Sequence, residues 1–200
     1  MSRQPNFEAR QNILCSAYGL FYERGFRGVS MDDVAKASKI KKANLFHYFP
    51  TKEELGLAVF DLVTSRFKEK ITNAYAPENS ADPIRFIDRI FASSQDSMKK
   101  NSCCRGCFMG NFAQEMSDHN ERLRTKIAEY FDFWLEQMTD VLERGRAQGY
   151  FKKNFKARES AGAILALLEG ALLFSKTRKD VTALQNARRM ASGYLETYRA

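Results

Sequence analysis

Residues 26–55, FRGVSMDDVAKASKIKKANLFHYFPTKEEL, constrain the fold most strongly, because helix-start and helix-stop signals alternate there over a short distance. Ser30 is followed by Met31 and two aspartates, an S-x-x-D pattern in which the serine hydroxyl accepts a backbone N–H of the first helical turn. The two carboxylates also favour the positive end of the helix dipole. A helix is therefore predicted to begin near Met31, and the polar residues 36–39 predict the turn that ends it.

A second short helix is predicted from about Lys41 to Tyr48, with Leu45 on its inner side. Pro50 cannot continue a hydrogen-bonded helix, and Thr51 with Glu54 forms a capping box that starts another one. Two short helices joined by a turn and followed by a supporting helix are typical of domains that place one helix in the major groove of DNA.

The outer side of the predicted second helix carries side chains suited to DNA. Lysines 41 and 42 can hold phosphates, while the amide of Asn44, the imidazole of His47 and the phenol of Tyr48 can reach base edges. The alternative is a solvated basic surface on an ordinary small helical protein. Spacing, capping, charge and aromatic content agree on the DNA-binding interpretation.

The segment from Ile13 to Phe60 resembles the DNA-binding domain of the TetR family of bacterial transcriptional regulators. The resemblance rests on the G-F-x-G-x-S pattern before the first motif helix and on L-F-H-Y-F-P-T-K-E-E-L at the end of the second. It implies that the second helix lies in the major groove and that Ser30 and Lys52 contact phosphates. The predicted DNA-binding residues are Ser30, Lys41, Lys42, Asn44, Phe46, His47, Tyr48 and Lys52.

Two positions depart from the family pattern, because Lys39 and Ala43 stand where glycine is usual or frequent. Lysine tolerates a positive φ poorly, so the turn either has a different geometry or absorbs about 1 kcal/mol of strain. Lysines 39, 41 and 42 together make the turn strongly basic, and a steep salt dependence of DNA affinity is expected.

Charge also points to the amino-terminal region. The 200-residue chain has a net charge of +8 and 44% hydrophobic residues, enough for a real core. Residues 1–50 contain eight basic and four acidic side chains, so this quarter of the chain carries half of the net charge. A polyanionic partner is favoured.

Targeting signals are not evident. No apolar stretch approaches the roughly 20 residues that span a bilayer, and the start MSRQPNFEAR lacks the hydrophobic segment of a signal peptide. We therefore expect a cytoplasmic protein with no membrane partner and no cofactor, whose four cysteines are reduced at rest.

The remaining chain predicts an all-α fold of about nine helices, with an N-terminal helix-turn-helix domain and a C-terminal helical domain for ligand binding and dimerisation. The expected domains are residues 1–52 for DNA binding, 53–76 as a connecting helix and 77–200 for the second domain. The other helices are expected near residues 7–24, 52–75, 83–100, 108–116, 120–149, 157–177 and 180–199.

The predicted helix at 157–177 contains AGAILALLEGALLF and is apolar nearly all round, so it must be covered on several sides. A second copy of the chain is an economical cover, and the TetR resemblance implies a four-helix bundle built from the last two helices of each protomer. A twofold dimer also explains how one motif per chain recognises two half-sites. The residues expected near this interface are Leu165, Leu168, Leu172 and Tyr194.

The cluster Cys103-Cys104-Arg105-Gly106-Cys107 lies at a predicted loop-to-helix junction with cations nearby. Cationic neighbours and a helix N-terminus favour the reactive thiolate, so Cys107 is a candidate sensor that Cys103 or Cys104 could resolve after oxidation. Residues 105–115 also resemble a subgroup, the N-ethylmaleimide-responsive repressor, whose matching cysteine senses electrophiles and oxidants. The predicted ligand or sensor residues are Cys107, Cys104, Cys103, Phe112, Phe131 and Trp134.

Three alternatives concern the same cysteines. Cys107 can be a small buried hydrophobe. Cys103, Cys104 and Cys107 with His119 can form a metal site, although their spacing matches no familiar zinc pattern. Cys104-x-x-Cys107 is also the dithiol spacing of oxidoreductases, but no strand pattern surrounds it and an all-helical enzyme would want a histidine where Gly110 stands.

The sequence therefore predicts a dimeric DNA-binding transcriptional regulator. We expect a repressor that an unidentified small-molecule or electrophilic inducer releases from a near-palindromic operator.

Overall fold

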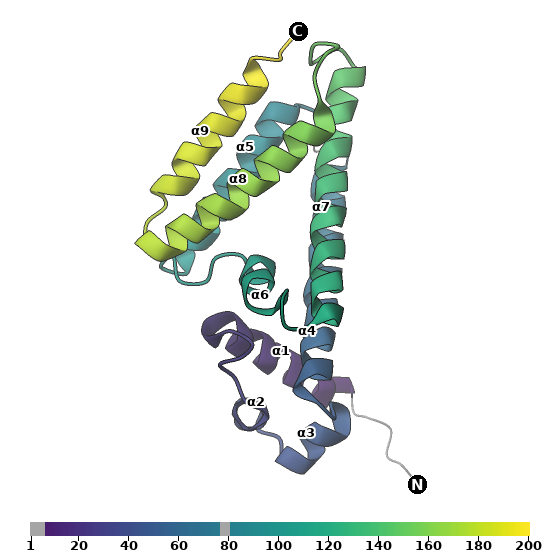
Figure 1. Ribbon diagram of the computed structural model, residues 1–200, viewed down its shortest axis with the longest axis vertical. Coiled ribbons are helices and arrows are strands. Elements are labelled where there is room, and N and C mark those ends of the chain that lie inside the picture. Colours follow the sequence, from purple (N-terminus) through teal and green to yellow (C-terminus); the bar gives the residue numbers. More distant parts are fainter. Residues whose placement is uncertain (1–6, 77–80) are drawn as a thin grey trace. The chain divides into compact units, whose positions relative to one another are not determined.

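The computed structural model describes residues 7–76 and 81–200, and the regular elements within them are helices (Figure 1). A single isolated bridge between Phe151 and Arg199 is the extended pairing found there. Residues 77–80 of the predicted break at 77–83, and residues 1–6 of the start MSRQPNFEAR, lie outside the described residues. The helices are α1 (Phe7–Arg24), α2 (Met31–Ser38), α3 (Lys42–Tyr48), α4 (Lys52–Tyr75), α5 (Pro83–Lys100), α6 (Phe108–Met116), α7 (Glu121–Ala147), α8 (Ala157–Arg178) and α9 (Thr182–Glu196).

Local signals explain where several helices begin and end. Gly25 ends α1 with a φ of 76°, a left-handed conformation that glycine adopts without strain. Asp82 caps α5 by accepting the backbone N–H of Arg85, and Pro83 occupies the first turn, where its missing N–H costs nothing. The all-α expectation and its helix ranges are confirmed.

The chain divides into two compact units, which cut across three of the helices. The first unit comprises the chain through Phe67 together with Asn111–Ile127, and the second comprises Lys68–Gly110 and Ala128–Ala200. This division differs from the segmentation expected from sequence, since residues 111–127 associate with the N-terminal part of the chain. We call the first unit the head and the second the effector unit.

An aromatic cluster forms the core of the head. Phe112, from the middle of α6, packs on three rings with centroid separations of 5.0 Å to Phe60, 5.7 Å to Phe26 and 6.0 Å to Phe21. Gly56 makes room for this cluster, because a Cβ there would stand 2.7 Å from the Phe26 ring. Buried aromatic surface of this kind is a large stabilising contribution in a small domain.

The effector unit is organised around α5, α8 and α9, which pack on one another. Arg188 on α9 makes two charge-assisted hydrogen bonds of 2.5 Å to Asp88 on α5, and these hydrogen bonds lower the pKa of Asp88. Trp134 Nε1 donates to the Tyr75 hydroxyl at 2.6 Å inside the core.

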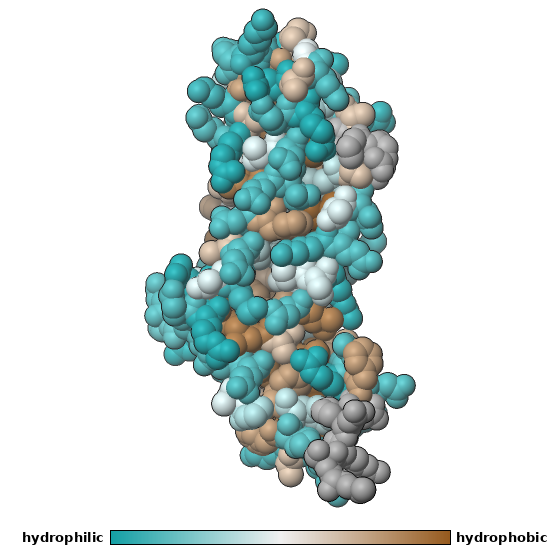
Figure 2. All heavy atoms as spheres, turned by 90° about the vertical axis from the view of Figure 1, so that its right-hand side faces the viewer, coloured by the Kyte–Doolittle hydropathy of each residue, from teal (hydrophilic) through white to brown (hydrophobic). Residues whose placement is uncertain are grey.

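Helix α8 contradicts the expectation that no apolar stretch of the chain approaches the length that spans a bilayer. Over Ala157–Arg178 it is long and apolar enough to cross a bilayer by length and composition, a test that the core helix of a globular protein also passes. Its buried residues, which include Ala161, Leu168 and Ser175, lie against the rest of the effector unit. Elsewhere the helices present a polar exterior, and Figure 2 shows a face on which hydrophilic side chains separate smaller apolar patches.

Candidate functional site

The start of α2 is fixed by a reciprocal capping box. Ser30 Oγ accepts the backbone N–H of Asp33 at 3.1 Å, and the Asp33 carboxylate accepts both the backbone N–H and the hydroxyl of Ser30, at 2.8 and 2.6 Å. These hydrogen bonds from Ser30 lower the pKa of Asp33. The hydroxyl of Ser30 is thus engaged in the cap of the free protein, on an exposed residue.

Lys39 occupies the turn between α2 and α3 in the left-handed region, with φ 56° and ψ 34°. Its backbone N–H donates to the carbonyl groups of Ala35 and Lys36, which closes α2 as a glycine would. From the sequence, this turn could either have a different geometry or hold Lys39 at a strained positive φ. The structure has the strained, positive φ. Lysine here costs about 1 kcal/mol relative to glycine.

Helix α3 displays the predicted DNA-binding side chains. Leu45 and Phe49 are buried and fix the helix on the head, and Arg10 lies over the Phe49 ring at 5.3 Å. The candidate side chains around these two residues face outward: Lys41, Lys42, Asn44, Phe46 and His47 are exposed, and Tyr48 is half-buried. The His47 and Tyr48 rings meet edge to face at 5.9 Å. The structure therefore brings the six α3 candidates together on one short helix.

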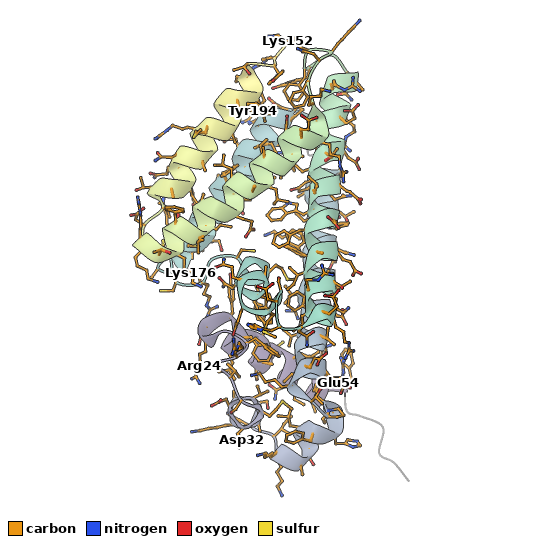
Figure 3. All side chains as sticks on the ribbon, in the orientation of Figure 1. Arg24, Asp32, Glu54, Lys152, Lys176 and Tyr194 are labelled. Atoms are coloured by element: carbon orange, nitrogen blue, oxygen red, sulfur yellow. The ribbon has the colours of Figure 1, made fainter. Side chains whose placement is uncertain are left out.

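Two of the predicted cations have partners within the head. Lys42 Nζ lies 2.7 Å from the carboxylate of Asp32, which Figure 3 labels on α2. Lys52 Nζ lies 4.6 Å from the centroid of the Phe26 ring and 3.5 Å from the Arg27 carbonyl oxygen. Burial lowers the pKa of Lys52.

Glu115 is a head residue that the sequence did not single out. Its carboxylate accepts the backbone N–H of Phe26 at 2.8 Å and of Arg27 at 2.6 Å, in the loop that leads into α2. Gly25 leaves space for it, because a Cβ there would stand 2.9 Å from Glu115 Oε2. No local pattern in the sequence signals a pairing between residues so far apart in the chain.

Phe112 requires a correction. It was expected to line a ligand site in the C-terminal domain, but it is buried among the aromatic rings of the head. The reason is that α6 contributes its last residues to the head, so the apolar face of that helix packs there.

The Cys107 thiol lies at the start of α6, in the effector unit. Its Sγ accepts the backbone N–H of Gly110 at 3.3 Å and thereby caps the helix. Glu169 on α8 approaches the same point, because a Cβ on Gly110 would lie 2.5 Å from Glu169 Oε2 and 3.7 Å from Cys107 Sγ. Burial, and then the negative charge of Glu169, raise the pKa of Cys107 well above its usual range.

The expectation that cationic neighbours favour a Cys107 thiolate is therefore wrong for this structure. Lys179 reaches the cysteine cluster on its other side, where its Nζ lies 3.7 Å from Cys104 Sγ and 3.5 Å from the Cys103 carbonyl oxygen. Cys104 is exposed and Cys103 is buried. Among the described residues, no group of three or more His, Cys, Asp or Glu side chains is arranged to hold a metal ion.

The two aromatic candidates on α7 have structural partners. Trp134 is buried and donates to Tyr75, while Phe131 is half-buried with its ring 5.2 Å from that of Tyr130. A cavity of about 530 Å³ lies where α7 ends and α8 begins, and none of the predicted site residues lines it. Its lining is Glu143, Arg146, Lys153, Asn154, Phe155, Lys156, Ala157, Arg158 and Glu159.

The predicted interface residues also need correction. Leu168 has 0% of its surface exposed, and Leu165 and Leu172 have 8% each, because all three face the interior of the effector unit. Tyr194, labelled on α9 in Figure 3, is exposed, with its hydroxyl 2.9 Å from Ser160 Oγ. The large apolar side chains left exposed on α8 and α9 are Leu173, Phe174, Met190 and Tyr194.

Comparison with known proteins gives two family matches. Residues 13–59 match the family described as bacterial regulatory proteins, tetR family, and residues 83–191 match the family described as tetracyclin repressor-like, C-terminal domain. The second match alone covers more than half of the chain.

Individual relatives cover nearly the whole chain at low identity. The transcriptional repressor DhaR of Mycobacterium sp. (strain GP1) is 24% identical over 90% of this chain and 87% of its own length. The repressor NemR of Escherichia coli (strain K12) is 23% identical over 94% of both chains, and its crystal structure in the reduced form has a TM-score of 0.84 over 96% and 97% of the two chains. A TetR regulatory protein from Rhodobacter sphaeroides also has a TM-score of 0.84, at 22% identity over 93% and 98%.

Proposed function

Because the chain belongs to the TetR family of bacterial regulatory proteins, it is a DNA-binding transcription regulator rather than an enzyme, and we propose that it is a repressor whose α3 contacts a near-palindromic operator. Regulators of this family bind operator DNA as homodimers and respond to small-molecule ligands. The exposed polar side chains gathered on α3 carry the proposal. The cytoplasm, where chromosomal DNA is found in bacteria, is the compartment in which such a protein would act.

Each α3 candidate would have a distinct role. Asn44 and His47 would form hydrogen bonds with base edges, and Phe46 and Tyr48 would supply apolar and phenolic contacts in the major groove. Lys41 and Lys42 would hold phosphates, as would Ser30 and Lys52 after leaving their intramolecular partners.

The exposed apolar side chains of α8 and α9 support the proposed dimer interface. Leu173, Phe174, Met190 and Tyr194 come from the two helices that pair with each other in the effector unit. Gly170 and Gly193 have open space where a Cβ would stand, which permits close approach of a second copy. A twofold axis through this surface would pair two heads on one operator.

The proposed response to an inducer involves α4 and α6. Both helices contribute residues to the head and to the effector unit. Glu115, near the end of α6, accepts the backbone N–H groups of Phe26 and Arg27 before α2. A movement of α6 would therefore shift the loop that leads into the helix-turn-helix. An inducer that acts at the Cys103–Cys107 cluster would favour a dimer whose heads no longer match consecutive half-sites.

The direct test is binding of the purified chain to DNA from the region upstream of its own gene, measured by fluorescence anisotropy against mixed-sequence DNA of equal length. We expect a preference of about a thousandfold for one near-palindromic site. Equal affinity for both DNAs would refute operator recognition. The rival oxidoreductase that uses Cys104 and Cys107 lacks support from the family assignment, and the same sample should not turn over peroxide or disulfide substrates.

A further inference from the structure

Lys39 combines two features that an ordinary surface lysine does not have. Its backbone is in the left-handed region, with φ 56° and ψ 34°, where a residue other than glycine costs free energy. It also stands in the segment 36–42, KASKIKK, which contains four lysines and no acidic residue. Like charges this close repel one another, so both the backbone and the local charge disfavour a lysine at this position.

The conformation of the turn is fixed by groups other than the Lys39 side chain. The backbone N–H of Lys39 donates to carbonyl groups in the last turn of α2, and the N–H of Ile40 donates to the Ala35 carbonyl at 3.0 Å. From α1, Asn12 Nδ2 donates to the Ser38 carbonyl at 2.7 Å. A strained backbone persists where surrounding contacts determine it in this way. The turn would form equally well with glycine, so the fold does not need the lysine side chain.

Lys179 has the same backbone conformation and shows how such a lysine is compensated. It ends α8 in the left-handed region, with φ 59° and ψ 30°. Its ammonium group has partners within the chain, because Nζ lies 3.5 Å from the Cys103 carbonyl oxygen and 3.7 Å from Cys104 Sγ. Lys39 is exposed, and its ammonium group makes no hydrogen bond or ion pair with the residues that the structure describes.

The acidic side chains of α2 do not supply an anion for Lys39. The Asp32 carboxylate lies 2.7 Å from Lys42 Nζ. The Asp33 carboxylate accepts the capping hydrogen bonds at the start of α2 and lies 3.8 Å from the Arg24 guanidinium group. Since other groups use both carboxylates, an anionic partner for Lys39 is expected from outside the chain.

We propose that Lys39 is a phosphate-binding residue of the operator complex, and that its ionic contact with the DNA backbone offsets the strain of the turn. This inference rests on the proposed function, because it adds a contact to the surface that α3 presents to DNA. The turn leads directly into α3, which begins at Lys42, and the flexible stem of a lysine lets its charge reach a neighbouring phosphate. Unlike Lys42, Lys39 gives up no intramolecular ion pair when it binds.

A lysine that contacts phosphate has a defined signature in binding measurements. Phosphates are common to all DNA sequences, so Lys39 adds affinity without adding sequence preference. Each phosphate contact also releases condensed counterions, which sets the dependence of affinity on salt. The loss of Lys39 should therefore appear in the salt slope as well as in the affinity.

The test uses the full-length protein and fluorescence anisotropy over a salt series, with the preferred upstream site and a mixed-sequence DNA of equal length. Lys39→Ala should weaken binding to both DNAs by about three- to tenfold and reduce the slope of log K against log salt by about one. Lys39→Arg keeps the charge and should keep the slope. Lys153→Ala, at an exposed position of the effector unit, removes the same formal charge and is the matched control, with an unchanged slope expected.

Lys39→Gly separates the side-chain contact from the backbone strain. It should lose as much DNA affinity as Lys39→Ala, because both variants lack the ammonium group. It should also raise the midpoint of thermal unfolding by about 2–4 °C, since glycine removes the strain, whereas alanine should give no such rise. A variant that is more stable and binds DNA more weakly is not expected if the lysine has only a structural role.

An unchanged salt slope in Lys39→Ala and Lys39→Gly would overturn the assignment. An equal fall in the slope for Lys153→Ala would also overturn it, because the effect would then come from net charge. So would a loss of affinity confined to the preferred site, since both DNAs carry the same phosphates. Failure of the proposed function would look different: the wild-type chain would bind both DNAs equally, while the slope for Lys39 would still be measurable on mixed-sequence DNA.

Discussion

The side chains proposed to contact DNA on α3 and the Cys107 thiol at the start of α6 differ in what surrounds them. On α3, Asn44 and His47 are exposed, so their intrinsic hydrogen-bonding chemistry is available as the sequence suggests. At Cys107, the neighbour that decides the chemistry is Glu169, from a helix much later in the chain. The hydrogen-bonding capacity of an exposed side chain follows from its residue type. The protonation of a buried group depends instead on the residues packed against it.

The largest expected effect concerns the second copy of the chain, which the α3 contacts to a two-half-site operator require. Phe174→Glu combined with Met190→Glu should dissociate the dimer and lower operator affinity at least about a hundredfold, because two linked heads bind far better than one. Sedimentation velocity and anisotropy on the same sample measure both effects. Arg158→Glu, an exposed charge on α8, is the control. A dimer of unchanged affinity would place the interface elsewhere.

Replacing the α3 side chains that we propose contact bases or phosphates tests the role proposed for each. Asn44→Ala and His47→Ala should each weaken operator binding by about 1–3 kcal/mol and leave mixed-sequence binding nearly unchanged. Lys42→Ala should weaken both and reduce the slope of log K against log salt by about one. These quantities come from anisotropy titrations over a salt series.

Asp32→Asn provides the matched test for Lys42, because it frees that ammonium group from its 2.7 Å ion pair. Affinity for both DNAs should rise by a few fold at low salt. Equal losses of specific and nonspecific binding in the Asn44 and His47 variants would contradict the assigned roles.

The link between α6 and the motif can be tested through Glu115. Glu115→Ala should lower the free energy of unfolding by about 1–3 kcal/mol, because the backbone N–H groups of Phe26 and Arg27 lose their acceptor. Glu115→Gln keeps one acceptor oxygen and should lose less. Urea denaturation measures the difference, and equal stability of the three proteins would mean that water replaces the carboxylate without cost.

The smallest expected effect concerns Lys39. Lys39→Gly should raise the free energy of unfolding by about 0.5–1 kcal/mol, since glycine adopts a φ of 56° without strain. Lys39→Ala removes the same charge but keeps the strain, so it should not stabilise the head. Thermal unfolding of the two variants separates the backbone effect from the charge effect, and equal stabilisation in both would attribute the gain to charge.

Much of the fold was predictable because its signals are local. Ser30, Asp82, Pro83 and Gly25 mark helix boundaries through hydrogen bonds and φ values that involve their immediate neighbours. The helical spacing of apolar residues likewise predicted the long helices. The predictions of which residues are exposed were wrong where a helix has apolar residues on several sides, as in α8. Spacing alone does not show which side of such a helix is buried by its own chain.

The expected interface residues illustrate that limit. Leu168 and Phe174 are both large and apolar on α8, yet one is buried within its own chain and the other is exposed. Phe112 was likewise assigned to a ligand site on the resemblance of residues 105–115, but its ring packs in the head. Residues close in sequence can belong to different cores when a helix joins two units.

The helical architecture, the helix-turn-helix and the types of side chain exposed on α3 follow from the amino-acid sequence, because capping, spacing and residue type are local properties. The tertiary structure decided which thiol is enclosed, which carboxyl group faces it and which apolar side chains stay exposed. These depend on contacts between distant segments, such as Glu169 with Cys107 and Glu115 with the loop before α2. Burial and contacts between distant segments control protonation and packing. The local pattern of residues does not specify either of these two factors.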